Sequence, residues 1–172
     1  MTSASSPTSA QPTYADLAAL PAYSEQSVPA AFEDVNGHLN IRHYVGIASE
    51  GLDESLVDCG IPQQWPNIAG SGIFSAEHHM LYLAELRTGD QISVRVRLVG
   101  RSERAVHVLV YLLDDTHQQV SYVMEEIFLH VSMDSRRTAA WPEDVATKID
   151  ARLAEHRALG FESPTSGSMA LR

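Results

Sequence analysis

The sequence predicts a single α+β domain, in which a first strand and one long helix precede a run of four strands and a terminal helix. Three observations predict this order. Apolar residues recur at helical spacing after position 41, alternate at strand spacing over residues 90–99, and return to helical spacing after position 143. A chain of 172 residues is long enough to bury the core of one domain and is short for two.

The first strand is expected over residues 26–32, directly before a polar turn at residues 33–40. A long helix follows the turn, because the next apolar positions are three and four residues apart and form one face: Ile41, Tyr44, Val45, Ala48, Leu52, Leu56 and Cys59. Gly60 favours the left-handed conformation that ends a helix, and Pro62 cannot continue it. Gly46 and Gly51 inside the helix each cost about 1 kcal/mol relative to alanine, so we expect close packing against a curved sheet.

Strand patterns dominate the middle of the chain, after the loop that ends at Gly70. Residues 90–99 alternate between apolar and polar, which places Arg95 and Arg97 on the outer face. Residues 105–113 are almost continuously apolar, which is typical of a strand covered on both faces. Residues 120–131 complete the sheet. Together with the strand-like residues after Gly70, these segments predict four strands in an antiparallel meander.

The terminal helix is expected to begin at residues 141–144, Trp-Pro-Glu-Asp, because proline and acidic residues are favoured in a first turn. Its apolar side consists of Val145, Ile149, Leu153 and His156, and we expect it to pack on the periphery. Residues 1–13 and 163–172 have too few core-forming residues to offset ordering entropy, so they are expected to be disordered tails. One domain, residues 14–162, lies between them.

Composition limits the classes of function. A net charge of −10 and a pI near 5.1 oppose nucleic acid as a partner. No apolar run is long enough to span a bilayer, and the first residues lack the basic and apolar segments of a secretory signal, so we expect a cytoplasmic protein. The single cysteine, Cys59, excludes an internal disulfide and a Cys-rich zinc site, and its place on an apolar helix face predicts burial.

The polar turn before the long helix is the strongest candidate for a functional site. Asp34 and Asn36 favour a turn because their side chains bond to the local backbone, and Gly37 permits dihedral angles that other residues resist. A helix start carries unpaired N–H groups and partial positive charge, so it can polarise a carbonyl oxygen. A carboxylate beside such amides, with the polar side chains of His38 and Asn40, is what hydrolysis of an activated acyl group requires.

Several of these residues also have a structural interpretation. Asp34 is favoured as a turn former, and Asn40 is favoured as a helix cap. Tyr44 suits the core, with its hydroxyl at the edge of a pocket. Glu126 shares a strand face with apolar residues, where a carboxylate is either catalytic or lies at a subunit boundary or a water-exposed edge.

The motif also resembles a known family. Its members follow the order Asp-x-x-Gly-His-x-Asn-x-x-x-Tyr, and here the matching residues are Asp34, Gly37, His38, Asn40 and Tyr44. This order resembles the signature of hotdog-fold acyl-CoA thioesterases of the hydroxybenzoyl-CoA thioesterase type. Residues 77–90 resemble the second strand of that family and the Gly-Asp turn behind it. The chain departs from the family at Ser49, where the family helix often carries an acidic residue.

A subfamily resemblance points to betainyl-CoA thioesterases of carnitine breakdown. It rests on Glu77, His79, the pair Tyr82-Leu83 and the late Leu129-His130-Val131. Glu77 in an acyl pocket suits a cationic acyl group, whereas at a rim it only faces water. His78 and His79 point to opposite faces of a strand, which makes them poor joint ligands of one metal ion.

The resemblance implies a curved antiparallel sheet wrapped around the long helix, and an acyl-CoA thioesterase that acts on a short polar acyl group. Asp34 would be the base or nucleophile, and amides near Gly37 and His38 would hold the oxyanion. The resemblance implies no metal or redox cofactor, and it implies at least a homodimer, with a homotetramer as the other common state. A non-catalytic acyl-CoA sensor and a hydratase are the alternatives.

Coenzyme A also requires a local basic patch for its phosphates. The candidates are the clustered arginines Arg87, Arg95, Arg97, Arg101, Arg104, Arg136 and Arg137. Arg95 and Arg97 have an equally plain interpretation as solvated residues on the outer face of a strand.

Overall fold

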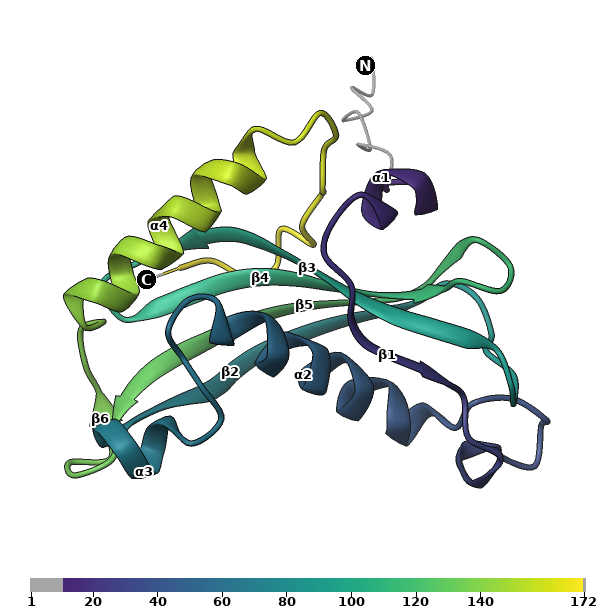
Figure 1. The fold of residues 1–172 in the computed structure, drawn as a ribbon, viewed down its shortest axis with the longest axis horizontal. Helices are drawn as coiled ribbons and strands as arrows, with labels where there is room; N and C mark the ends of the chain where they lie inside the picture. Colours follow the sequence, from purple (N-terminus) through teal and green to yellow (C-terminus); the bar gives the residue numbers. More distant parts are fainter. Residues whose placement is uncertain (1–10, 172) are drawn as a thin grey trace, which may run out of the picture.

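A strongly curved antiparallel sheet runs the length of the molecule, and the long helix α2 (Ile41–Val57) lies across one of its faces (Figure 1). The computed structural model describes residues 11–171. The elements that precede β2 in the chain are α1 (Tyr14–Ala18), β1 (Tyr23–Ser27), α2 and α3 (Trp65–Ala69). The later elements are β2 (Ser71–Tyr82), β3 (Gln91–Arg101), β4 (Ala105–Asp114), β5 (Gln119–Ser132), β6 (Arg137–Thr138) and α4 (Glu143–Arg157). The expected α+β hotdog arrangement is confirmed.

The strand order differs from the expected four-strand meander. The order in the sheet is β1-β3-β4-β5-β2, so only β3, β4 and β5 follow one another as neighbours. β2 lies at the far edge and pairs with β5, from Ser71 opposite Ser132 to Tyr82 opposite Tyr122. Residues 83–90 therefore carry the chain from one side of the sheet to the other. Alternation along one strand shows which residues share a face, but it does not show which strand lies beside it.

The first strand is also shorter and earlier than expected. β1 ends at Ser27, and the apolar residues Ala30–Phe32 form a 3₁₀ turn instead of a strand. Pro29 precedes this turn with an extended backbone and donates no hydrogen bond, which separates the strand from the turn.

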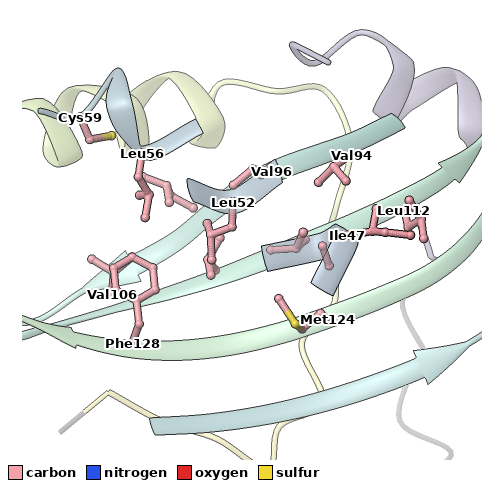
Figure 2. Close-up of a cluster of buried hydrophobic side chains, with 14 of the residues drawn as sticks. Ile47, Leu52, Leu56, Cys59, Val94, Val96, Val106, Leu112, Met124 and Phe128 are labelled. Carbon is pink, nitrogen blue, oxygen red and sulfur yellow. The ribbon is translucent and has the colours of Figure 1, made fainter. Parts of the chain in front are cut away.

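The main core lies between α2 and the concave face of the sheet. Figure 2 shows Ile47, Leu52 and Leu56 of α2 beside Val96, Met124 and Phe128 of the sheet, all within one buried cluster. The predicted helical face is confirmed, including Cys59, which is 2% exposed and whose thiol pKa is raised by burial. α4 adds the predicted residues Val145, Ile149 and Leu153 to the same cluster, so it is part of the core and not only peripheral.

A second cluster covers the other face of the sheet, where Leu17 and Leu20 pack on residues of β4 and β5. All ten residues of β4 are buried, as expected for a strand covered on both faces. This cover corrects the prediction for Arg95, which is 7% exposed and not solvated. No helix among residues 11–171 is long and apolar enough to cross a membrane.

The two expected tails have different outcomes. Residues 1–10 lie outside the described residues, while Thr13 caps α1 by accepting the Asp16 amide. The other end differs from the expected disorder, because residues 163–166 lie against the sheet. Ser163 accepts from Arg97 at 2.8 Å, and the amide of Ser166 donates to Glu125 at 2.7 Å. Composition does not show such pairings, since each depends on a single polar group on a distant strand.

Candidate active site

A cavity of about 470 Å³ opens between the polar turn, the start of α2 and the end of β2. It contains the predicted residues Asp34, His38 and Tyr44. Its other lining residues come from the same turn and from the segment that follows β2: Asn36, Leu39, Ile41, Tyr82, Leu83, Ala84 and Glu85. The carboxylate predicted to be catalytic therefore stands in a cavity beside the first residue of α2.

The turn holds the carboxylate of Asp34 through its own backbone. Asp34 Oδ1 accepts from the Asn36 amide at 2.8 Å, and the Gly37 amide donates to the Asp34 carbonyl at 3.0 Å. Gly37 has a φ of 78°, a region that residues with a Cβ rarely adopt. The Asp34 amide in turn donates to the His38 carbonyl at 3.0 Å, which closes the loop. The polar motif is thus a hydrogen-bonded turn that fixes the position of one carboxylate.

The surroundings of Asp34 keep it ionised. Its pKa is lowered chiefly by the hydrogen bond from the Asn36 amide, which favours the charged form. His38 contributes in the same direction when it is protonated, with Nδ1 3.7 Å from Asp34 Oδ1. The side chain of Asp34 is 16% exposed, so the charged oxygen atoms still reach the cavity.

Asn40 organises the start of α2. Its side chain accepts from the Arg42 amide at 3.1 Å, and its carbonyl accepts from the His43 amide at 3.0 Å. Asn40 is therefore the helix cap, the structural role that sequence analysis left open. The amide of Ile41 has no acceptor among residues 11–171, and Ile41 lines the cavity. One N–H at the positive end of a 17-residue helix is thus available to an oxyanion.

This arrangement changes which amides are candidates for the oxyanion hole. The Gly37 amide, expected to serve there, already donates within the turn. The His38 amide, the other expected donor, acts on the Asp34 carboxylate and helps to lower its pKa. The Asn40 cap accounts for the amides of Arg42 and His43, which leaves the amide of Ile41. The signal was present in the sequence, because a cap at Asn40 identifies the first helical residue and hence its unpaired N–H.

Aromatic side chains form part of the wall of this cavity. Tyr44 is 5% exposed, as expected for a core residue at a pocket edge, and Tyr122 behind it is fully buried. Tyr82 is 45% exposed and lines the cavity. Its ring centroid lies 5.2 Å from that of Tyr44 and 5.0 Å from that of Tyr122. In the sequence, Tyr82 and Leu83 are visible only as part of the subfamily pattern, because their place in the cavity wall depends on where β2 ends.

Glu77 and His79 do not reach this cavity within one copy of the chain. β2 alternates, so Tyr82 faces α2 with its partner Tyr122, while Glu77 and His79 face the opposite side of the sheet. His79 lies opposite Glu125, which bonds to His107 at 2.8 Å on that outer face. Strand periodicity paired Glu77 with His79 correctly, but it did not show that their face is turned away from Asp34.

Glu126, by contrast, is buried on the side of the sheet that faces α2. It accepts from Ser75 Oγ at 2.6 Å, and His78 Nε2 lies 3.3 Å from the same oxygen atom. It is 3% exposed and is not among the residues that line the Asp34 cavity. Its burial therefore differs from the water-exposed edge that sequence analysis considered.

Most of the clustered arginines have partners inside the chain. Arg97 contacts the ring of Phe161 at 4.8 Å, and Arg101 pairs with Asp150. Arg87 pairs with Glu85 at the cavity, and Arg136 lies 5.3 Å from the ring of Phe74 beside the free edge of β2. Arg136 is exposed at that edge, and Arg137 is exposed on β6, which pairs with the opposite side of β5, so both remain candidates for the phosphates of coenzyme A.

Possible metal ligands gather elsewhere. Among residues 11–171, Asp90, Asp114 and His117 bring three ligand atoms within 4.8 Å of one another. Asp114 already accepts from the amide of His117 at 3.0 Å and from Gln119 at 2.9 Å, and His117 Nδ1 lies 2.7 Å from it. These bonds close the turn between β4 and β5, so the cluster has a structural explanation.

Comparisons with a family model and with individual proteins indicate the same family. Residues 28–149 match the family model of the Thioesterase-like superfamily. A betainyl-CoA thioesterase of Pseudomonas aeruginosa is 30% identical over 135 residues, which cover 78% of this chain and 85% of that protein. An L-carnitine dehydrogenase/betainyl-CoA thioesterase of Agrobacterium fabrum is 26% identical over 148 residues, and the match covers 86% of this chain and 30% of that protein.

Solved structures agree on the fold. A Staphylococcus aureus protein in complex with CoA has a TM-score of 0.77 at 21% identity and covers 86% of this chain and 92% of its own. A 1,4-dihydroxy-2-naphthoyl-CoA thioesterase from Synechocystis has a TM-score of 0.66 at 14% identity and covers 76% of this chain and 96% of its own. The same sheet and long helix thus occur in proteins of widely different sequence.

Proposed function

Because the chain belongs to the Thioesterase-like superfamily, it is a thioester hydrolase of acyl-CoA type, and we propose that it hydrolyses betainyl-CoA or a similarly short polar acyl-CoA to the free acid and CoA. The observation that supports this proposal is the pairing of an ionised Asp34 with the free amide of Ile41 in one cavity. The betainyl relative, which the chain matches over 85% of its length, supports the choice of acyl group.

In the proposed mechanism, the Asp34 carboxylate lies beside the thioester carbonyl carbon and brings about nucleophilic attack on it. As the carbon becomes tetrahedral, its oxygen becomes negative and accepts from the Ile41 amide, where the dipole of α2 adds to the stabilisation. The carbon–sulfur bond then breaks, and CoA leaves as a thiolate that takes a proton. Asp34 acts either by attacking the carbon, with later hydrolysis of the resulting anhydride, or by activating water. Its lowered pKa favours direct attack, since a general base works best with a pKa near the operating pH.

We also propose that the working enzyme is a homodimer joined along β2. β2 is an edge strand, and such an edge presents unpaired backbone groups to another chain. Phe74 on β2 is 39% exposed, as expected for a residue that a partner covers.

If the two β2 strands pair antiparallel about a two-fold axis, the Tyr82 end of one β2 lies beside the Ser71 end of the other. Arg136 of one copy would then stand near the cavity of its partner, where CoA phosphates need a cation. Light scattering at micromolar protein should give a dimer or tetramer, and an active monomer would contradict this.

Two variants test the mechanism. Asp34→Asn keeps the turn acceptor but removes the charge, and thiol release should fall about a hundredfold or more. Ile41→Pro removes the free N–H together with the isoleucine side chain and keeps the helix, because proline is favoured at the first helical position. Asn40 before it has φ −65° and ψ 135°, which suits a residue before proline. This variant should lose about a hundredfold to a thousandfold in kcat.

Matched controls separate chemistry from folding. Ile41→Ala keeps the amide and shortens the same side chain, so it should be far less impaired than Ile41→Pro, while Glu77→Gln alters a carboxylate outside the cavity and should retain activity. Thermal melting should show all four variants folded. If Asp34→Asn hydrolyses thioesters at nearly the normal rate, the carboxylate has no chemical role. If Ile41→Pro matches Ile41→Ala, the oxyanion is held elsewhere.

A further inference from the structure

The substrate proposed above places a positive charge very close to the reacting bond. In a betainyl thioester a single methylene joins the quaternary nitrogen to the carbonyl carbon, so the two atoms are about 2.5 Å apart. Any enzyme that brings this carbonyl to Asp34 and Ile41 must therefore hold the ammonium group in the same cavity. What lines that cavity decides how the cation is recognised, and the following inference rests on the proposed function.

The charge of the lining suits a cation. Asp34 and Glu85 are its acidic members, and Glu85 pairs with Arg87, which leaves Asp34 as the carboxylate without a strong cationic partner. Among the described residues that line the cavity, none is a lysine or an arginine. An anionic acyl group would meet repulsion here, whereas a cationic one meets attraction.

The cavity that contains Asp34 also has an aromatic surface. A quaternary ammonium offers no hydrogen-bond donor, so it is recognised by the faces of aromatic rings. Tyr82 presents such a ring, since it lines the cavity and is 45% exposed. Tyr44 meets it at an interplanar angle of 80°, and Tyr122 at 50°. Because these two neighbours are buried, the ring of Tyr82 is fixed before substrate arrives.

We propose that Tyr82, held by Tyr44 and Tyr122, is the specificity residue that binds the quaternary ammonium of the acyl group, with Asp34 supplying the opposing charge. The three rings come from different parts of the chain, at the start of α2, the end of β2 and the start of β5. The ammonium lies between the Tyr82 ring and the Asp34 carboxylate. Recognition and chemistry are thus joined, because a substrate seated by its cation already has its carbonyl beside Ile41.

The test compares two acyl groups of nearly equal shape. Betainyl-CoA carries a trimethylammonium group, and 3,3-dimethylbutanoyl-CoA has a neutral tert-butyl group in the same position. The quantity measured is the ratio of kcat/KM for the two thioesters. Tyr82→Leu removes the ring, while Tyr82→Phe keeps it and removes only the hydroxyl.

We expect Tyr82→Leu to lower the ratio about fivefold to thirtyfold, the range of a partly desolvated cation–π contact. Tyr82→Phe should change the ratio less than twofold. Equal losses on both thioesters in Tyr82→Leu would overturn the proposal, because the residue would then act through shape alone. A phenylalanine variant as impaired as the leucine variant would also overturn it, since the hydroxyl would be responsible.

Binding separates this proposal from the proposed function. Calorimetric titration of Asp34→Asn with each CoA ester gives the ratio of the two affinities with little turnover. Because this background lacks the Asp34 charge, the preference that remains for betainyl-CoA measures the ring, and the Tyr82 variants can be made in the same background. If the wild type hydrolyses neither ester but binding still prefers betainyl-CoA and loses that preference in Tyr82→Leu, the catalytic proposal fails and the aromatic site stands. If hydrolysis occurs and the preference does not depend on the ring, only the aromatic site fails.

Discussion

Two glycines of α2 should respond in opposite ways to the same substitution. A Cβ at Gly51 would lie 2.5 Å from Val94 Cγ1 and 2.8 Å from Val94 Cγ2, distances that real Cβ atoms do not show. A Cβ at Gly46 would meet nothing within 4 Å. Both positions are helical and neither has a positive φ, so conformational preference is the same at each. Only the approach of β3 to the helix differs.

The expected magnitudes follow from two opposing effects. Alanine is favoured over glycine in a helix by about 1 kcal/mol, so Gly46→Ala should raise the free energy of unfolding by up to that amount. Gly51→Ala gains the same preference but forces the helix away from Val94, and overpacking of this kind costs about 1 to 3 kcal/mol. Val94 cannot rotate out of the way, because the branch point itself is crowded. We therefore expect a net loss for Gly51→Ala, measured by urea unfolding beside Gly46→Ala.

A double-mutant cycle identifies the cause. Val94→Ala alone should destabilise by leaving a cavity, and in combination with Gly51→Ala it removes both Cγ contacts of the new methyl group. The Cβ at position 94 remains, so the clash is relieved in part. The double variant should therefore be more stable than the sum of the single effects predicts, by about 1 kcal/mol or more. Additive effects, or a Gly51→Ala variant as stable as Gly46→Ala, would refute close packing as the reason for this glycine.

The remaining predictions concern pH. The lowered pKa of Asp34 means that kcat/KM should persist as pH falls through the ordinary carboxyl range near 4, and a loss of activity already at pH 6 would point to another titrating group. His156 is buried and accepts from the Leu98 amide at 2.8 Å, and burial chiefly, with Arg152 and Arg97, lowers its pKa to about 4. Between pH 6.5 and 4, His156 is therefore protonated in the unfolded state but neutral in the folded state. As the pH decreases through this window, the free energy of unfolding decreases by about 3 kcal/mol in all. His156→Gln should lack this part of the loss, and a parallel decline in both proteins would contradict it.

The sequence predicted those parts of the fold that depend on neighbours along the chain. The face of α2, the cap at Asn40 and the turn at Asp34 all rest on spacings of three or four residues, and each is found. The position of β2 was missed, because it depends on a pairing between Tyr82 and Tyr122 that no local pattern encodes. The burial of Arg95 was missed for the same reason, since the segment that covers it lies far away in sequence.

The same distinction between local patterns and distant pairings applies to the candidate site. Asp34, His38 and Tyr44 lie within one turn and the helix it starts, so a local motif placed them together. Glu77 and His79 were joined to them through a resemblance, and strand alternation turns their face away from the cavity. The partners that complete the cavity are Tyr82 and Leu83, which become visible only when the end of β2 is known to meet the start of α2.

The exposed apolar residues give this arrangement a functional meaning. Three of the large hydrophobic side chains that remain exposed line the cavity: Ile41 at 63%, Tyr82 at 45% and Leu83 at 48%. Burial of such groups stabilises a folded protein, so their exposure around one carboxylate leaves free energy of burial that folding of this chain does not use. A bound acyl group covers this apolar rim while its carbonyl accepts from Ile41. The binding energy of the non-reacting part of the substrate is then released at the site where charge develops, which is the condition under which binding accelerates a reaction.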